Sequence, residues 1–116
     1  MTVEFAITSE TFDGDRGLVS MSGEVDIYTA PRLKERLALL LDAGVTRVVV
    51  DLSGVSFIDS TALGVLIGAV RRLREAGGVM ALVVATRPVE RVLMLTGLDR
   101  VFTIHATRDA AVSALG

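Results

Sequence analysis

A continuous β-branched run constrains the fold of this chain more than any other feature of the sequence. The segment Val48 to Leu52 begins with three consecutive valines, a side chain that favours extended backbone. Strands whose side chains are apolar on both faces are typical of parallel sheets, which are covered on both sides. The run therefore predicts a buried parallel strand within an α/β domain.

The segment after this run carries the apolar face of an amphipathic helix, the element that joins two parallel strands. Its apolar residues recur at intervals of three and four. They are Leu63, Leu66, Ile67, Val70 and Leu73. The pair Gly77-Gly78 ends this helix, because glycine is the common residue just beyond a helix C-terminus.

The remaining segments repeat this alternation of strand and helix. Turn-forming residues at Asp13 to Gly17 predict a hairpin between the first two strands. Thr29 is the expected N-cap of the first helix, with Pro31 in its first turn, and Gly23 to Tyr28 the expected loop before it. The expected strands cover residues 3–8, 18–22, 48–52, 79–85 and 101–104, and the expected helices cover 29–44, 59–77, 88–97 and 109–115.

This order, ββαβαβαβα, predicts one α/β domain over residues 1–116. Its sheet is expected to be mixed and mostly parallel, with an N-terminal hairpin and about four packed helices. Hydrophobic residues make up 51% of the chain, enough to bury such a core.

Charge and composition exclude several classes of function. Twelve basic and fourteen acidic residues give a net charge of −2, which argues against generic binding to nucleic acid. There is no cysteine and His105 is the single histidine, so we expect neither a metal site nor a cofactor, and His105 is expected at a strand edge. The longest apolar stretch, Ala62 to Val70, is too short to span a membrane, and residues 1–4 lack a signal-peptide pattern. We therefore expect a cytoplasmic protein.

Polar residues at the start of the second helix form the candidate site. Asp59 is the expected N-cap, and Ser60 and Thr61 follow in the first turn. This edge of a parallel sheet, where strands end and helices begin, is where functional groups gather. A phosphate on Ser60 would lie at the positive end of the helix dipole. Capping alone would also account for these residue types.

Three segments of the chain resemble the STAS domain, and within it the bacterial anti-sigma factor antagonists. The segments are Gly23 to Asp26, Asp51 to Leu66 and Thr96 to Phe102. In that family the serine after the helix-start aspartate accepts a phosphate, which implies Ser60 here. The resemblance also implies that Asp26 lies near the acceptor.

The resemblance implies a regulatory binding protein and not an enzyme. The unphosphorylated form would bind an anti-sigma factor that is itself a serine kinase of the GHKL type, and the sigma factor would be released. Phosphorylation of Ser60 would end that binding, and a PP2C-type phosphatase would restore it. Thr61 and Ala62 stand where many relatives have serine and glycine, so Thr61 is an alternative acceptor.

The partner-binding surface is expected to include the helix start, the neighbouring loop and two glycines further along the helix. These residues are Asp26, Ile27, Tyr28, Thr29, Asp59, Ser60, Thr61, Ala62, Leu63, Gly64 and Gly68.

Two other functions remain open from the sequence. One is a constitutive STAS scaffold in a stress-signalling or lipid-transport complex, in which Ser60 is never modified. The other is a small nucleotide-binding domain or enzyme that uses Asp26, Asp59 and Ser60 as a polar cluster. The chain has no glycine-rich phosphate loop of a known pattern, which argues against this last function.

Overall fold

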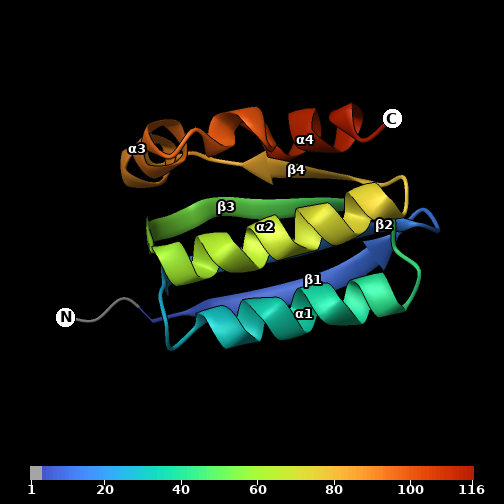
Figure 1. The fold of residues 1–116 in the computed structure, drawn as a ribbon, viewed down its shortest axis with the longest axis horizontal. Coiled ribbons are helices and arrows are strands. Elements are labelled where there is room, and N and C mark those ends of the chain that lie inside the picture. Colours follow the sequence, from blue (N-terminus) through green and yellow to red (C-terminus); the bar gives the residue numbers. More distant parts are fainter. Residues whose placement is uncertain (1–3) are drawn as a thin grey trace.

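The valine run lies in the middle strand of the sheet. In the computed structural model, which describes residues 4–116, β3 (Arg47–Ile58) is the third of five strands in the order β1-β2-β3-β4-β5 (Figure 1). Val48, Val49 and Val50 are fully buried. The predicted buried strand is confirmed.

The element order ββαβαβαβα is confirmed as well, with one 3-10 turn added before the last strand. β1 and β2 form an antiparallel hairpin, and every later pairing is parallel. The elements are β1 (Ala6–Phe12), β2 (Arg16–Val25), α1 (Ala30–Asp42), β3 (Arg47–Ile58), α2 (Ser60–Glu75), β4 (Val79–Val83), α3 (Arg87–Leu95), η1 (Leu98–Arg100), β5 (Thr103–His105) and α4 (Arg108–Ala114).

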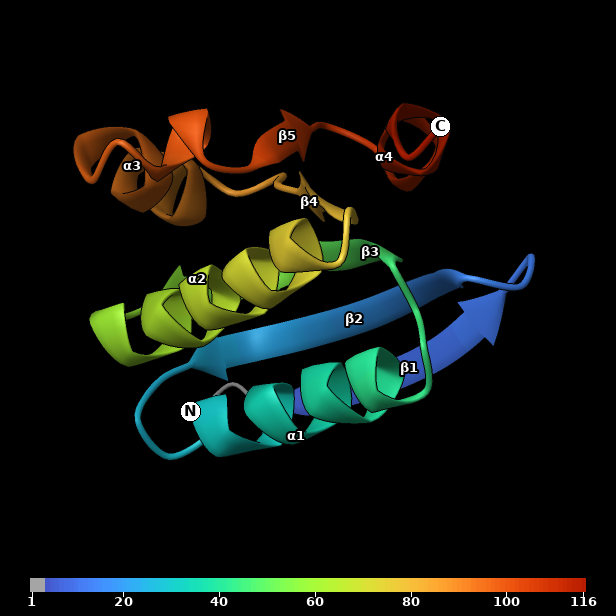
Figure 2. The same ribbon diagram turned by 45° about the vertical axis from the view of Figure 1, so that its right-hand side comes forward.

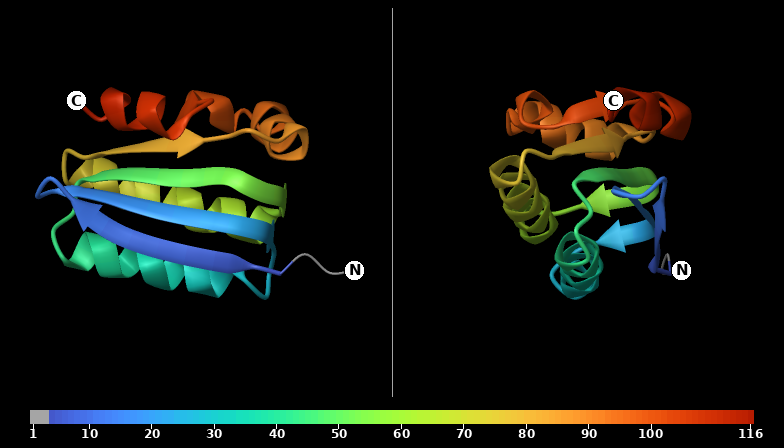
Figure 3. Two further views of the ribbon diagram at one scale, coloured as in Figure 1. Left: turned by 180° about the vertical axis from the view of Figure 1, so that it is seen from behind. Right: turned by 90° about the vertical axis from the view of Figure 1, so that its right-hand side faces the viewer.

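The helices cover the two faces of the sheet unequally. α1, α2 and α3 contribute buried residues to the main core, together with one face of the strands. α4 packs on the opposite face against β3, β4 and β5, where Ala111 and Leu115 meet Val49 and Ala81. Figure 2 shows α1 and α2 in front of the sheet. Figure 3, seen from behind, shows that no helix covers the opposite face of β1 and β2.

β2 and β3 are longer than predicted, and this difference shapes the site. The segments Gly23–Val25 and Ser53–Ile58 were expected as loops but continue as strand, because the two strands pair with each other as far as Val25 and Ile58. Register shifts interrupt this pairing. Gly23 has a φ of +91°, and a Cβ there would lie 2.7 Å from the carbonyl oxygen of Glu4. Gly23 is therefore required by the fold itself.

The remaining boundaries differ from the predicted ones by at most four residues. β1 begins at Ala6 and runs on to Phe12, and the predicted part at residue 3 lies outside the described residues, as does most of the segment tested for a signal peptide. β4 stops at Val83, two residues before the predicted end. Over residues 4–116, no helix has both the length and the apolar character needed to cross a membrane.

Candidate functional site

The carboxyl ends of β2 and β3 bring two loops together. Val25 and Ile58 are the last paired residues of these strands. Immediately after them, the backbone N–H of Asp59 donates to the carbonyl oxygen of Val25 at 3.1 Å. The loop that begins at Asp26 therefore lies beside the start of α2, as the resemblance implies.

Asp59 caps α2, as predicted. Its carboxylate oxygen Oδ1 accepts a hydrogen bond from the backbone N–H of Ala62 at 3.0 Å, and its carbonyl oxygen accepts one from Leu63 at 3.0 Å. Ser60 and Thr61 occupy the first turn and are both exposed. Neither hydroxyl makes a hydrogen bond within the described part of the chain.

A phosphate on Ser60 would find backbone donors close by. The first N–H groups of any helix lack partners within the helix, and the Asp59 side chain uses only the one at Ala62. The helix dipole also favours an anion at this end. The isolated domain can therefore carry a phosphate here without unfolding.

Asp26 holds its own loop together. Its Oδ1 accepts hydrogen bonds from the backbone N–H groups of Tyr28 at 2.9 Å and Thr29 at 3.1 Å. Thr29 stands at the N-cap position of α1, as predicted, although its side chain makes no cap hydrogen bond. Its hydroxyl instead accepts from the Asp26 N–H at 2.9 Å and donates to the carbonyl oxygen of Glu24 at 3.1 Å.

Exposed apolar side chains surround the two loops. Ile27 is 61% exposed, Tyr28 86% and Phe57 46%. Tyr28 is thus free of the core and available as an anchor for a partner. Phe57 was missed from the sequence because the end of β3 was expected to be a loop. In a strand, its position next to the buried Ile58 would have predicted an outward side chain.

Two residues of the predicted partner surface belong to the core. Ala62 and Leu63 are 0% and 5% exposed, because they lie on the face of α2 that packs on the sheet. Their side chains support the helix from beneath and are out of a partner's reach. Gly64 and Gly68 are exposed and lie further along α2.

A second polar cluster, on the other face of the sheet, was not predicted. Asp51 is 4% exposed, and its Oδ2 accepts from Nη2 of Arg108 at 2.8 Å. Burial raises the pKa of Asp51, but hydrogen bonds from Ser53 and the Arg108 guanidinium outweigh it and hold the pKa below its ordinary value. Arg108 also donates to the Ser20 hydroxyl at 3.3 Å. The polar groups of this cluster bond to one another, which is typical of a structural contact.

Over residues 4–116, no three His, Asp or Glu side chains come together in a way that could hold an ion. His105 lies on the edge strand β5, as expected, and its Nε2 is buried without a hydrogen-bond partner among residues 4–116.

Comparison with known proteins identifies relatives with one named role. A family model described as STAS domain matches residues 6–111. The anti-sigma-B factor antagonist of Bacillus subtilis (strain 168) is 34% identical over 94 residues, which are 81% of this chain and 85% of that protein. The anti-sigma-B factor antagonist of Listeria monocytogenes is 35% identical over 92 residues, which are 79% of this chain and 81% of that protein.

A solved structure agrees with these sequence relatives. The crystal structure of an anti-sigma factor antagonist from Mycobacterium paratuberculosis matches with a TM-score of 0.89 and 30% sequence identity. The match covers 99% of this chain and 98% of that chain.

Proposed function

The chain belongs to the STAS domain family, and we propose on that premise that it acts as an anti-sigma factor antagonist switched by phosphorylation of Ser60. In this role it is a binding protein and not an enzyme. The observation that carries the proposal is the geometry of the α2 start. There Ser60 is exposed beside a capped helix end, with a hydroxyl that makes no hydrogen bond to the described residues.

The proposed partner is an anti-sigma factor that is also a serine kinase of the GHKL type. Its binding surface on this chain comprises the exposed residues of the two loops and the α2 start. Ile27, Tyr28 and Phe57 supply apolar contact area around Ser60. While Ser60 is unmodified, the kinase is held by this chain and the sigma factor is free.

Phosphorylation would end this binding through charge and desolvation. A phosphate adds a charge of about −1.5 to −2 at neutral pH. It would stand next to the Asp59 carboxylate and near the loop of Asp26, so a covering partner would have to bury several negative charges together. A hundredfold loss of affinity requires only about 2.7 kcal/mol.

A PP2C-type phosphatase completes the proposed cycle by removing the phosphate. Thr61 is the alternative acceptor, since it too is exposed in the first turn of α2. The proposal includes a cytoplasmic location, where these partners act.

The test is an intact-mass spectrum of the protein purified from its native cells, before and after phosphatase treatment, with the site mapped by fragmentation. One phosphate on Ser60 is expected. The Ser60→Ala variant, which cannot be switched off, is then expected to capture the kinase.

Other outcomes of this experiment would replace parts of the proposal. A phosphate on Thr61 alone would move the switch by one residue. A single unmodified mass under all growth conditions would contradict the switch and favour a constitutive scaffold.

A further inference from the structure

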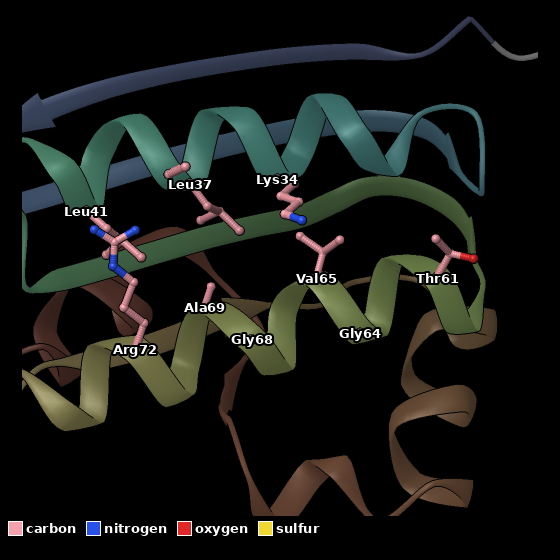
Figure 4. Close-up of a pocket in the computed structure, with 10 residues that line it drawn as sticks. Lys34, Leu37, Leu41, Thr61, Gly64, Val65, Gly68, Ala69 and Arg72 are labelled. Carbon is pink, nitrogen blue, oxygen red and sulfur yellow. The ribbon is translucent and has the colours of Figure 1, made fainter.

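A groove between α1 and α2 starts beside the proposed switch (Figure 4). Its volume is about 460 Å³. It reaches from Thr61, the residue after the proposed acceptor, to Arg72, which is about 16 Å along α2 at 1.5 Å per residue. Its lining is mostly apolar and includes Leu37, Leu41 and Val65.

Two glycines keep one wall of this groove bare. Gly64 and Gly68 lie one helical turn apart in α2, and a Cβ added at either would meet nothing within 4 Å. The fold therefore has no steric need for glycine at these positions. A helix is less stable with glycine in its interior than with alanine. The two glycines therefore lower the stability of α2 while they leave its backbone accessible. Two helices approach more closely where the side chains between them are small.

The charged side chains that line the groove are both cations. Figure 4 shows the Lys34 amino group across from Val65, and the Arg72 guanidinium near Leu41. Arg72 is paired with Asp42, whereas Lys34 makes no ion pair with any residue of the described range 4–116. None of the described residues that line the groove carries a carboxylate. An occupant with a carboxylate facing Lys34 would complement this charge.

We propose that one α-helix of the anti-sigma factor kinase docks in this groove, with small apolar side chains against Gly64 and Gly68 and a carboxylate against Lys34. The inference rests on the proposed function and adds a second contact to the same partner. Three turns of helix match the length of the groove, and an amphipathic helix presents one apolar face every three to four residues. The groove is continuous with the α2 start at Thr61, so one partner can cover both.

Titration calorimetry with the purified kinase, first captured by the Ser60→Ala variant, tests this contact. Gly68→Leu would fill the groove two turns away from Ser60, and we expect it to weaken binding at least tenfold. Gly68→Ala is expected to raise the melting temperature by about 4 °C while it weakens binding several-fold, which separates docking from folding. Lys34→Gln is expected to weaken binding about tenfold.

Matched controls come from α1 residues outside the groove. Glu35→Gln changes a neighbouring charge, and Leu39→Ala removes an exposed apolar side chain. Both should leave the affinity within twofold of the unchanged protein.

The outcomes distinguish the groove from the switch. If Gly68→Leu and Lys34→Gln bind normally while Ser60→Glu does not, the groove contact is wrong and the proposed function stands. If the unchanged chain binds no such kinase, the proposed function itself fails and the inference fails with it. A dimer of this chain that Gly68→Leu abolishes would make a second copy the occupant and would also overturn the inference.

Discussion

Asp51, inside β3, and Asp59, at the start of α2, show how one residue type serves two roles in the same strand–helix unit. Each carboxylate accepts a hydrogen bond from a backbone N–H a short way along the chain, from Ser53 at 2.9 Å and from Ala62 at 3.0 Å. Asp51 is buried and paired with Arg108. Asp59 stands beside an exposed serine and makes no ion pair within residues 4–116.

The difference lies in what each region can still accept. At Asp51 the Arg108 guanidinium and the backbone N–H of Ser53 each donate to one carboxylate oxygen, so both oxygens already have a partner. At Asp59 the helix end keeps free N–H groups, and the adjacent hydroxyl is open to modification. In the region around Asp51 the polar groups bond to one another, which suits a structural role. In the region around Asp59 polar groups remain available, which suits regulation.

Substitution of Ser60, beside Asp59, should give the largest effect of these tests. Ser60→Glu is expected to weaken binding to the anti-sigma factor kinase at least a hundredfold, or about 2.7 kcal/mol, because it adds a negative charge inside the proposed interface. Calorimetry measures the affinity. Ser60→Ala is the control and should bind as the unchanged chain does. Equal binding by the Glu variant would show that charge at this position does not operate the switch.

Substitution of Arg108, which pairs with Asp51, should lower the stability and leave kinase binding unchanged. Arg108→Leu removes the cation that faces the buried Asp51 carboxylate and is expected to lower the free energy of unfolding by about 2 kcal/mol. The Arg108 side chain is 49% exposed, so the loss should be smaller than for a fully buried pair. Urea denaturation measures it, with Arg71→Leu, an exposed position, as the control. A loss of kinase affinity at full stability would contradict the structural role.

The cap at Asp59 should give an intermediate loss of stability. Asp59→Ala removes the hydrogen bond to the Ala62 N–H and is expected to cost about 1 kcal/mol in the free energy of unfolding. Asp59→Asn is the matched variant, since its side chain still accepts that hydrogen bond. Equal losses for both variants would mean that the carboxylate contributes through its charge rather than as a cap.

Lowering the pH should change the stability least of these tests, and the change should come from Asp51. The pKa of Asp51 is lower in the folded chain than the ordinary value of 3.8, so its contribution to stability is complete above pH 3.8. That contribution is lost as pH falls through the folded pKa. The stability difference between the unchanged chain and Asp51→Asn should therefore narrow below about pH 3.8 in urea titrations at pH 3, 5 and 7. A difference that stays constant over this range would contradict the lowered pKa.

Local features were readable from the sequence, and features that depend on distant partners were not. The Asp59 cap follows from residues within one turn, and the valine run alone identifies a buried strand. The extension of β2 and β3 escaped prediction because the partner strand sets where pairing ends.

Side-chain contacts between elements escaped prediction for the same reason. Asp51 and Arg108 are 57 residues apart, and nothing near either one indicates the other. The groove likewise combines Lys34 from α1 with glycines from α2. In the sequence, only the spacing of Gly64 and Gly68 indicated the groove, and that spacing does not identify the facing helix.

The order of the strands in the sheet has a consequence for synthesis on the ribosome. Each strand pairs with the strand that precedes it in the chain, so no strand waits for a distant segment to be translated. Each parallel pairing joins residues roughly 20 to 35 positions apart, which keeps the loops that must close short. β1, β2, α1, β3 and α2 can therefore assemble in the order in which they emerge. The loops around Ser60 can then come together before β4 and β5 join the sheet.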